Sequence, residues 1–175
     1  MEVILLVSQN TITSFITGLK EAGIDFIVSL PCTAIKHFLP GIIEDEHFTY
    51  VPVSNESDGI SICAGASLGG KKPALLVEAP GILVGAYALA KGIRYGGPML
   101  LVGDHRGSFG DGAADFYYGA ATPVLRLLDS LDIPYSIVRE SDKLKAEIIN
   151  AQRTIDGFSR PAAILLGMEE LWQMK

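Results

Sequence analysis

The feature that most constrains the fold is an alternation of short, mostly apolar runs with longer segments whose apolar residues recur at helical spacing. The apolar runs, which predict strands, are residues 26–30, 48–53, 74–77, 99–102, 135–138 and 162–166. The helical segments are residues 12–22, 33–43, 56–68 and 82–91, with two more that open at Thr122-Pro123 and at Ser141. Strands that are apolar on both faces need cover on both faces. We therefore predict an α/β fold, a parallel sheet of about six strands with helices on both faces.

Length and composition predict a single domain spanning residues 1–175. The net charge is −6 and the 14 basic residues are scattered, which argues against a nucleic-acid partner. Cys32 and Cys63 match no metal-ligand spacing, and we expect two thiols rather than a disulfide. The apolar run Val3 to Val7 is too short to span a membrane and lacks the features of a signal peptide. We expect a cytoplasmic protein with no membrane partner.

Ligands of open α/β sheets bind outside the carboxyl ends of the strands, here after residues 30, 53, 77 and 102. After residue 53, Asn55 is placed to cap a helix that begins at Glu56. Acidic residues are common in first helical turns, so the local pattern explains Glu56 without a special role. The helix that follows is rich in Gly, Ala and Ser up to Gly70. Two interpretations of this smooth surface stay open: tight packing on its own sheet, or contact with a subunit or cofactor.

Two further turns carry polar groups. The turn from Glu78 to Gly81 either lines the same cleft or is an ordinary turn. The long irregular stretch from Gly103 to Ala121 includes His105 and Arg106, which would suit an anion or lie in a solvated loop.

These segments resemble the alpha subunits of sulfopyruvate decarboxylase, with phosphonopyruvate decarboxylases as near relatives. The resemblance covers roughly residues 12–170, and its most specific block is residues 53–66, which contains Glu56. Residues 23–32 are similar to the family's first strand and turn, and residues 103–107 to its His-Arg loop.

The resemblance implies a pyrimidine-binding domain of a thiamine-diphosphate-dependent 2-oxo acid decarboxylase, a carbon–carbon lyase. Sulfopyruvate would be converted to sulfoacetaldehyde, a step of coenzyme M biosynthesis. Glu56 matches the carboxylate that bonds N1′ of the cofactor's aminopyrimidine. By the same resemblance, Pro31 and Gly81 are candidate cofactor contacts. Cys32, Thr33, His105 and Arg106 are candidate substrate contacts, with His105 also a candidate for proton transfer.

A partner should complete the enzyme. The family's cofactor diphosphate is held through Mg²⁺ by a Gly-Asp-Gly segment followed some thirty residues later by Asn. The triplet Gly110-Asp111-Gly112 has no Asn in the stretch Pro134 to Asp142, so we predict no metal site in this chain. A separate beta subunit is expected to hold the diphosphate and Mg²⁺, in a homo- and hetero-oligomer that shares the cofactor and acts on a small anionic 2-oxo acid.

The chain departs from the family pattern in three places. Relatives often carry an amide and a hydroxyl where this chain has Glu78-Ala79-Pro80-Gly81, and Arg and a second Glu where it has Asn55 and Ser57. The run Val3 to Val7 is extra. A non-catalytic binding module of the same fold is therefore the main alternative. A flavodoxin-like or dinucleotide-binding protein is weaker, because Pro31-Cys32-Thr33 is no glycine-rich phosphate turn.

Overall fold

The computed structural model describes residues 5–107, 115–167 and 172–174 of the chain. Its strands are β1 (Leu5–Val7), β2 (Phe26–Ser29), β3 (Thr49–Pro52), β4 (Pro73–Leu76), β5 (Leu100–His105), β6 (Tyr135–Val138), β7 (Ala162–Gly167) and β8 (Trp172–Met174). Its helices are α1 (Gln9–Glu21), the short 3-10 helix η1 (Ile35–His37), α2 (Leu39–Ile43), α3 (Glu56–Leu68), α4 (Ala79–Val84), α5 (Ala86–Arg94), α6 (Asp115–Ser130) and α7 (Leu144–Phe158).

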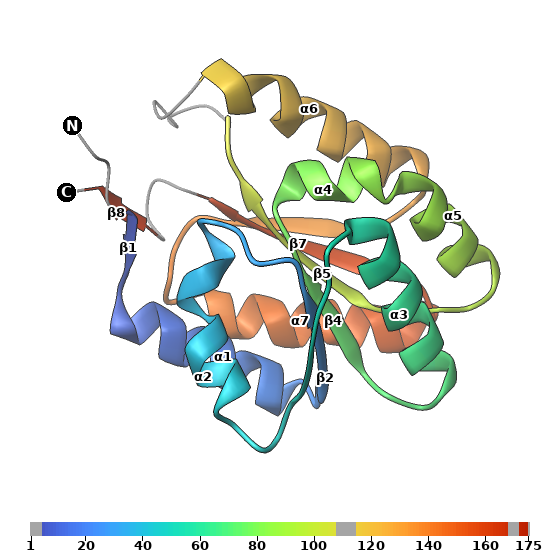
Figure 1. The fold of residues 1–175 in the computed structure, drawn as a ribbon, viewed down its shortest axis with the longest axis horizontal. Coiled ribbons are helices and arrows are strands. Elements are labelled where there is room, and N and C mark those ends of the chain that lie inside the picture. Colours follow the sequence, from blue (N-terminus) through green and yellow to red (C-terminus); the bar gives the residue numbers. More distant parts are fainter. Residues whose placement is uncertain (1–4, 108–114, 168–171, 175) are drawn as a thin grey trace.

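The main sheet has six parallel strands in the order β3-β2-β4-β5-β7-β6. Helices α1, α2 and α7 cover one face, and α3, α4, α5 and α6 cover the other (Figure 1). This confirms the predicted α/β class and the parallel sheet of about six strands.

The central strands alternate between two apolar cores, as the two-residue period of a strand requires. In β4, Ala74 and Leu76 join the core under α1 and α7, whereas Leu75 joins the core under α3 to α6. In β5, Leu100 and Leu101 divide in the same way. All five side chains are fully buried, which explains why these runs carry no polar residue in the sequence.

The helix predicted over residues 82–91 is two helices, α4 and α5, which meet at Gly85. Gly85 lies against Ile60 of α3, and a Cβ there would collide with the Ile60 side chain. The chain therefore turns at Gly85 to let α4 and α5 each pack on α3.

The helix predicted to open at Thr33 is wrong in its start and its continuity. No side chain caps η1, and the backbone N–H of Ile35 instead points to Sγ of Cys32 at 3.5 Å. Because Pro40 is suited only to a first helical turn, a new helix, α2, starts at Leu39.

The predicted helix start at Thr122-Pro123 is also wrong, because α6 begins at Asp115 and holds Pro123 in its interior. The cost of one missing backbone hydrogen bond is offset by burial of Val124 and Leu128 in the core below. Helix α7 begins at Leu144 rather than Ser141, with Lys143 at the N-cap and no side-chain cap.

The amino-terminal apolar run has a place that the sequence did not suggest. Leu5–Val7 forms β1 and pairs antiparallel with β8, Leu5 opposite Met174. This two-stranded sheet lies beside the main sheet and brings the two ends of the chain together (Figure 1). In the described ranges, no helix is long and apolar enough to cross a membrane.

Tight packing of the smooth helix α3 within the chain is confirmed for its inner side, and contact of its outer side with a subunit or cofactor stays a prediction. Its inner side packs within the chain: Gly59 faces Leu75 and Val53, and Ala64 faces Gly97. Its outer side is open at Gly65, where a Cβ would meet nothing within 4 Å.

Two glycine substitutions should separate these sides. Gly65→Ala is expected to raise the unfolding free energy by about 0.5–1 kcal/mol, since Ala has the higher helix propensity and the site has room. Gly97→Ala is expected to lower it by about 1–3 kcal/mol, because its Cβ would lie 2.9 Å from Cα of Ala64. Urea denaturation of the two variants measures both changes. Changes in unfolding free energy of the same sign would contradict this description of α3.

Candidate functional site

The four turns singled out in the sequence lie at one edge of the sheet. Strands β3, β2, β4 and β5 are consecutive neighbours and parallel, so their carboxyl ends point the same way. The strand order reverses between β2 and β4, because β3 lies on one side of β2 and β4 on the other. Such a switch point is where open α/β sheets leave a ligand crevice.

Glu56 is the first residue of α3 and stands beside this crevice. Asn55 caps the helix, as predicted, and its side chain accepts a 2.8 Å hydrogen bond from the backbone N–H of Ser57. Glu56 is half-buried, and its carboxylate forms no hydrogen bond or ion pair with the described part of the chain. It is therefore available to a donor from outside the chain.

Gly81 packs directly on the Glu56 side chain. A Cβ built on Gly81 would lie 2.6 Å from Cγ and 2.8 Å from Cδ of Glu56, and closer still to Oε1. Ser57 fixes the same two helices by donating a 3.2 Å hydrogen bond to the carbonyl of Val84. Helix α4 thus forms a wall that leaves room for the Glu56 carboxylate only because residue 81 has no side chain.

The turn after β2 supplies Pro31, Cys32 and Thr33. Pro31 and Thr33 are exposed and Cys32 is half-buried. Burial raises the pKa of the Cys32 thiol to about 11, and the carboxylates of Asp104 and Glu78 add to that rise. Cys32 is therefore a neutral thiol at physiological pH, and its sulfur faces the N-terminus of η1. Cys32 and Cys63 are both free, as predicted.

His105 and Arg106 do not form an exposed loop. Strand β5 continues through His105, which lies opposite Gly167 of β7, and both side chains are at least nine-tenths buried. Strand alternation directs His105 to one face of the sheet and Asp104 to the other. The expectation that His105 stands in an irregular loop is wrong, because pairing with β7 extends the strand by three residues beyond Val102, whereas Arg106 lies in the turn that follows the strand.

Asp104 is a site residue that the sequence did not single out. It is 1% exposed, and its Oδ1 accepts a 2.8 Å hydrogen bond from the backbone N–H of Ala79, the first residue of α4. Its Oδ2 is buried without a hydrogen-bond partner in the described ranges. Burial raises the pKa of Asp104 from 3.8 to about 6; the Ala79 N–H and Arg106 oppose this rise, and Glu78 adds to it.

This raised pKa predicts a pH-dependent stability. A carboxyl whose pKa is higher in the folded chain contributes stability that is full below about pH 4 and is lost as pH rises through about 6. The loss is about 3 kcal/mol at most, from about 1.4 kcal/mol per pKa unit. Relative to Asp104→Asn, the natural chain should therefore lose that stability between about pH 4 and pH 7. Urea denaturation across this range measures it; a difference that does not change with pH would contradict the burial of the charge.

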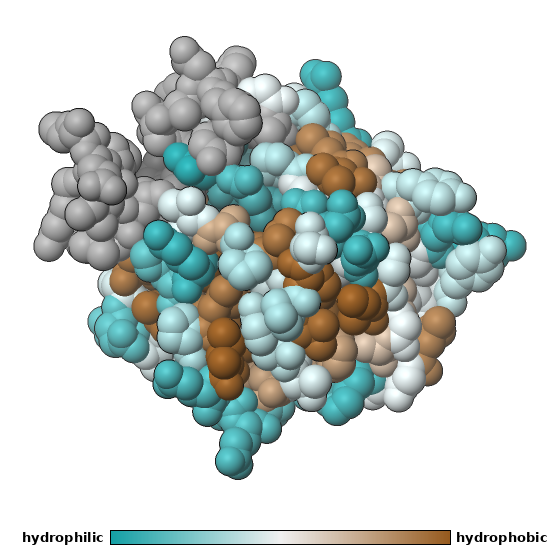
Figure 2. Space-filling view, viewed as in Figure 1, coloured by the Kyte–Doolittle hydropathy of each residue, from teal (hydrophilic) through white to brown (hydrophobic). Residues whose placement is uncertain are grey.

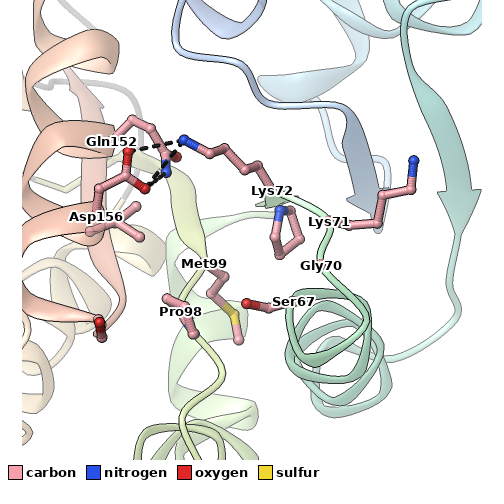
Figure 3. Close-up of a pocket in the computed structure, with 11 residues that line it drawn as sticks. Ser67, Gly70, Lys71, Lys72, Pro98, Met99, Gln152 and Asp156 are labelled. Carbon is pink, nitrogen blue, oxygen red and sulfur yellow. Dashed lines mark hydrogen bonds and ion pairs between the residues drawn. The ribbon is translucent and has the colours of Figure 1, made fainter.

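A cavity of about 290 Å³ lies elsewhere, near the amino ends of β4 and β5 (Figure 3). Its charged lining is already paired: Lys72 Nζ lies 2.9 Å from Asp156, which also accepts a 2.8 Å hydrogen bond from Gln152. This cavity is at the edge of the sheet opposite Glu56 and offers no group that awaits a ligand.

The surface near Glu56 is hollowed and partly apolar. A shallow depression of about 460 Å³ lies between β3 and α3, lined by Val53, Asp58, Ser61 and Ile62 among others. Figure 2 shows hydrophobic residues gathered between α2 and α3 on the face toward the viewer. Val84 and Tyr87, at the junction of α4 and α5, are 59% and 75% exposed.

Comparison with known proteins identifies a family and several relatives. Residues 9–117 match the family model of the thiamine pyrophosphate enzyme, N-terminal TPP binding domain. The sulfopyruvate decarboxylase subunit alpha of Methanococcus maripaludis is 31% identical over 160 residues, which are 90% of this chain and 95% of the relative. A sulfopyruvate decarboxylase of Methanosarcina acetivorans is 32% identical over 128 residues, 72% of this chain but 32% of that protein.

A solved structure shares the fold. The 2-oxoglutarate:ferredoxin oxidoreductase from Magnetococcus marinus superposes with a TM-score of 0.70 at 17% identity, covering 99% of this chain and 31% of that one. The chain belongs to the family of thiamine pyrophosphate enzymes, as their N-terminal TPP-binding domain. Within that family it is a homologue of the sulfopyruvate decarboxylase alpha subunits.

The structure brings Glu56 and Gly81 into contact. It also places Cys32 close enough to Glu78 and Asp104 for their carboxylates to raise the pKa of its thiol. It separates His105 from Asp104 by strand alternation. The triplet Gly110-Asp111-Gly112 lies outside the described residues. Within the described ranges, no three His, Cys, Asp or Glu side chains are grouped to hold a metal ion.

Proposed function

We propose that the chain is the alpha subunit of a thiamine-diphosphate-dependent decarboxylase that acts on sulfopyruvate, with Glu56 activating the aminopyrimidine of the cofactor. The observation that carries the proposal is the Glu56 carboxylate at the start of α3, open to an outside donor and walled by Gly81. The homology to sulfopyruvate decarboxylase alpha subunits supports the choice of substrate.

Thiamine diphosphate supplies, when bound, a carbon nucleophile that accepts the electrons released as carbon dioxide leaves a 2-oxo acid. The contribution of this chain is to hold a proton between Glu56 and N1′ of the cofactor's pyrimidine. The carboxylate suits this task because it is half-buried, and a hydrogen bond is stronger where water is excluded. Gly81 leaves room for the carboxylate in this position, since a side chain at 81 would fill the space that the carboxylate occupies.

Arg106 is the candidate for the anionic end of the substrate, because its guanidinium can form paired hydrogen bonds with a sulfonate or carboxylate. Pro31, Cys32 and Thr33 would line the entrance from β2, with Cys32 as a neutral thiol. His105 remains a candidate for proton transfer, from the other face of β5.

The partner is proposed to be a second polypeptide that carries the diphosphate and Mg²⁺ site. The longer relative from Methanosarcina acetivorans supports this, because this chain matches only 32% of its length. The open side of α3 at Gly65, the depression beside β3 and the exposed Val84 and Tyr87 supply a surface along α3 on which the partner could pack.

The test combines the chain with its second subunit. With thiamine diphosphate and Mg²⁺ present, carbon dioxide release should be seen from sulfopyruvate only when both subunits are mixed. Phosphonopyruvate and pyruvate serve as comparison substrates. Release from phosphonopyruvate instead would keep the decarboxylase and change the substrate.

One observation favours a second function, a non-catalytic module. The stretch Glu78-Ala79-Pro80-Gly81 lacks the amide and hydroxyl that the resemblance leads us to expect there, and Glu78 brings a negative charge close to Asp104. Cofactor binding by the two-subunit complex without release of carbon dioxide from any of the three acids would support that module and contradict the decarboxylase.

A further inference from the structure

Asp104 holds the start of helix α4, the helix whose residue Gly81 packs against Glu56. Its Oδ1 receives the N–H of Ala79 at 2.8 Å, from a residue 25 positions away, and this bond is buried. Glu78, the N-cap residue of α4, makes no side-chain capping bond, and Pro80 has no N–H. The first turn of α4 is therefore tied to β5 through Asp104.

The backbone of β5 also touches the start of α4. A Cβ on Gly103 would lie 3.2 Å from Cα and 3.3 Å from N of Ala79, a contact tighter than most real side chains make. The absence of a side chain at Gly103 lets β5 approach close enough for Asp104 to reach the Ala79 N–H. One hydrogen bond and one close contact thus fix the first residue of α4 on β5, while Ser57 holds the other end of the helix through Val84.

The position of the α4 start affects Glu56, because the residue of α4 that contacts Glu56 lies within one helical turn of it. Gly81 is two residues beyond Ala79, and its backbone is in contact with the Glu56 carboxylate. A displacement of the α4 start by a few tenths of an ångström would open or close the space around Oε1. We infer that Asp104 is a positioning residue that acts on Glu56 through Ala79 and Gly81, and so sets the geometry in which Glu56 meets the cofactor.

This inference rests on the proposed function for its catalytic meaning, but its structural step can be measured without cofactor. In the full chain labelled with ¹³C at glutamate carboxyls, Asp104→Ala should shift the Glu56 carboxyl resonance. It should also raise the exchange rate of the Ala79 amide at least about tenfold, because one buried hydrogen bond is lost. Asp104→Asn retains an oxygen that can accept from Ala79, and both properties should stay near those of the natural chain.

Ile148→Ala is the control for general destabilisation. Ile148 is fully buried on α7, in the core on the other face of the sheet. This variant should lower global stability and leave the Glu56 carboxyl resonance unchanged. The same Glu56 carboxyl resonance in Asp104→Ala and in the natural chain would overturn the inference.

In the two-subunit complex, Asp104→Ala should lower kcat by about 10–100-fold with KM for the 2-oxo acid nearly unchanged, and Asp104→Asn should recover most of the loss. A fall in kcat that Asp104→Asn does not recover would overturn the positioning role. Failure of the proposed function is distinguishable: the two-subunit complex would then release no carbon dioxide, or Glu56→Gln would leave its release intact, while the cofactor-free measurements would still report whether Asp104 positions Glu56.

Discussion

A Glu56→Gln variant is expected to lose turnover by roughly 10²–10⁴-fold in the two-subunit complex. The glutamine side chain has nearly the same size and fits beside Gly81, but it is uncharged and cannot hold the proton that the ionised carboxylate would share with the pyrimidine. Steady-state release of carbon dioxide measures the loss, and isothermal titration with thiamine diphosphate shows whether the cofactor still binds.

The interpretation of that result depends on stability and on the cofactor. The variant should unfold within about 0.5 kcal/mol of the natural chain, since Glu56 makes no hydrogen bond or ion pair with described residues. A cofactor affinity that changes by less than about tenfold would place the effect in activation rather than in binding. Turnover within a few-fold of the natural chain would remove Glu56 from the mechanism.

The sequence predicted the sheet well because its strands carry their own signal. Each is a short apolar run between polar turns, and the predicted strand Tyr135 to Val138 matches β6 at both ends. The helix Glu56 to Leu68 also matches at both ends, because Asn55 caps its start and Gly69 follows its last residue. These boundaries are determined by residues adjacent in the sequence, so the sequence alone predicts them.

The errors arose where distant residues decide the local structure. The Thr122-Pro123 pair looks like a helix start, yet burial of Val124 and Leu128 keeps a longer helix intact through Pro123. The run Val3 to Val7 had no assignment, because the partner of Leu5 is Met174 at the other end of the chain. No local sequence pattern predicts the continuation of α6 through Pro123 or the pairing of β1 with β8.

The candidate site shows the same division. Glu56 was found through the resemblance of residues 53–66 to a known family, not through its surroundings. The sequence did not indicate Asp104, because it lies beside His105 and Arg106 in a stretch predicted to be irregular rather than in a strand. What sets it apart, the bond to Ala79 and a pKa near 6, exists only when β4 and β5 lie side by side.

Gly81→Ala is expected to damage the site as severely as the loss of the Glu56 charge, although it removes no polar group. The new Cβ would lie within 2.6–2.8 Å of the Glu56 Cγ and Cδ, so either α4 moves or the carboxylate leaves its position. We expect a loss of about 1–3 kcal/mol in unfolding free energy and a fall in turnover of at least about 100-fold. Gly65→Ala on the open side of α3 is the matched control and should be more stable than the natural chain.

A double-mutant cycle that combines Gly81→Ala with Glu56→Asp supplies the decisive measurement. Asp is one methylene shorter, so Gly81→Ala should cost less stability in that background. Equal costs in the two backgrounds would mean that the Gly81 side of α4 does not confine residue 56.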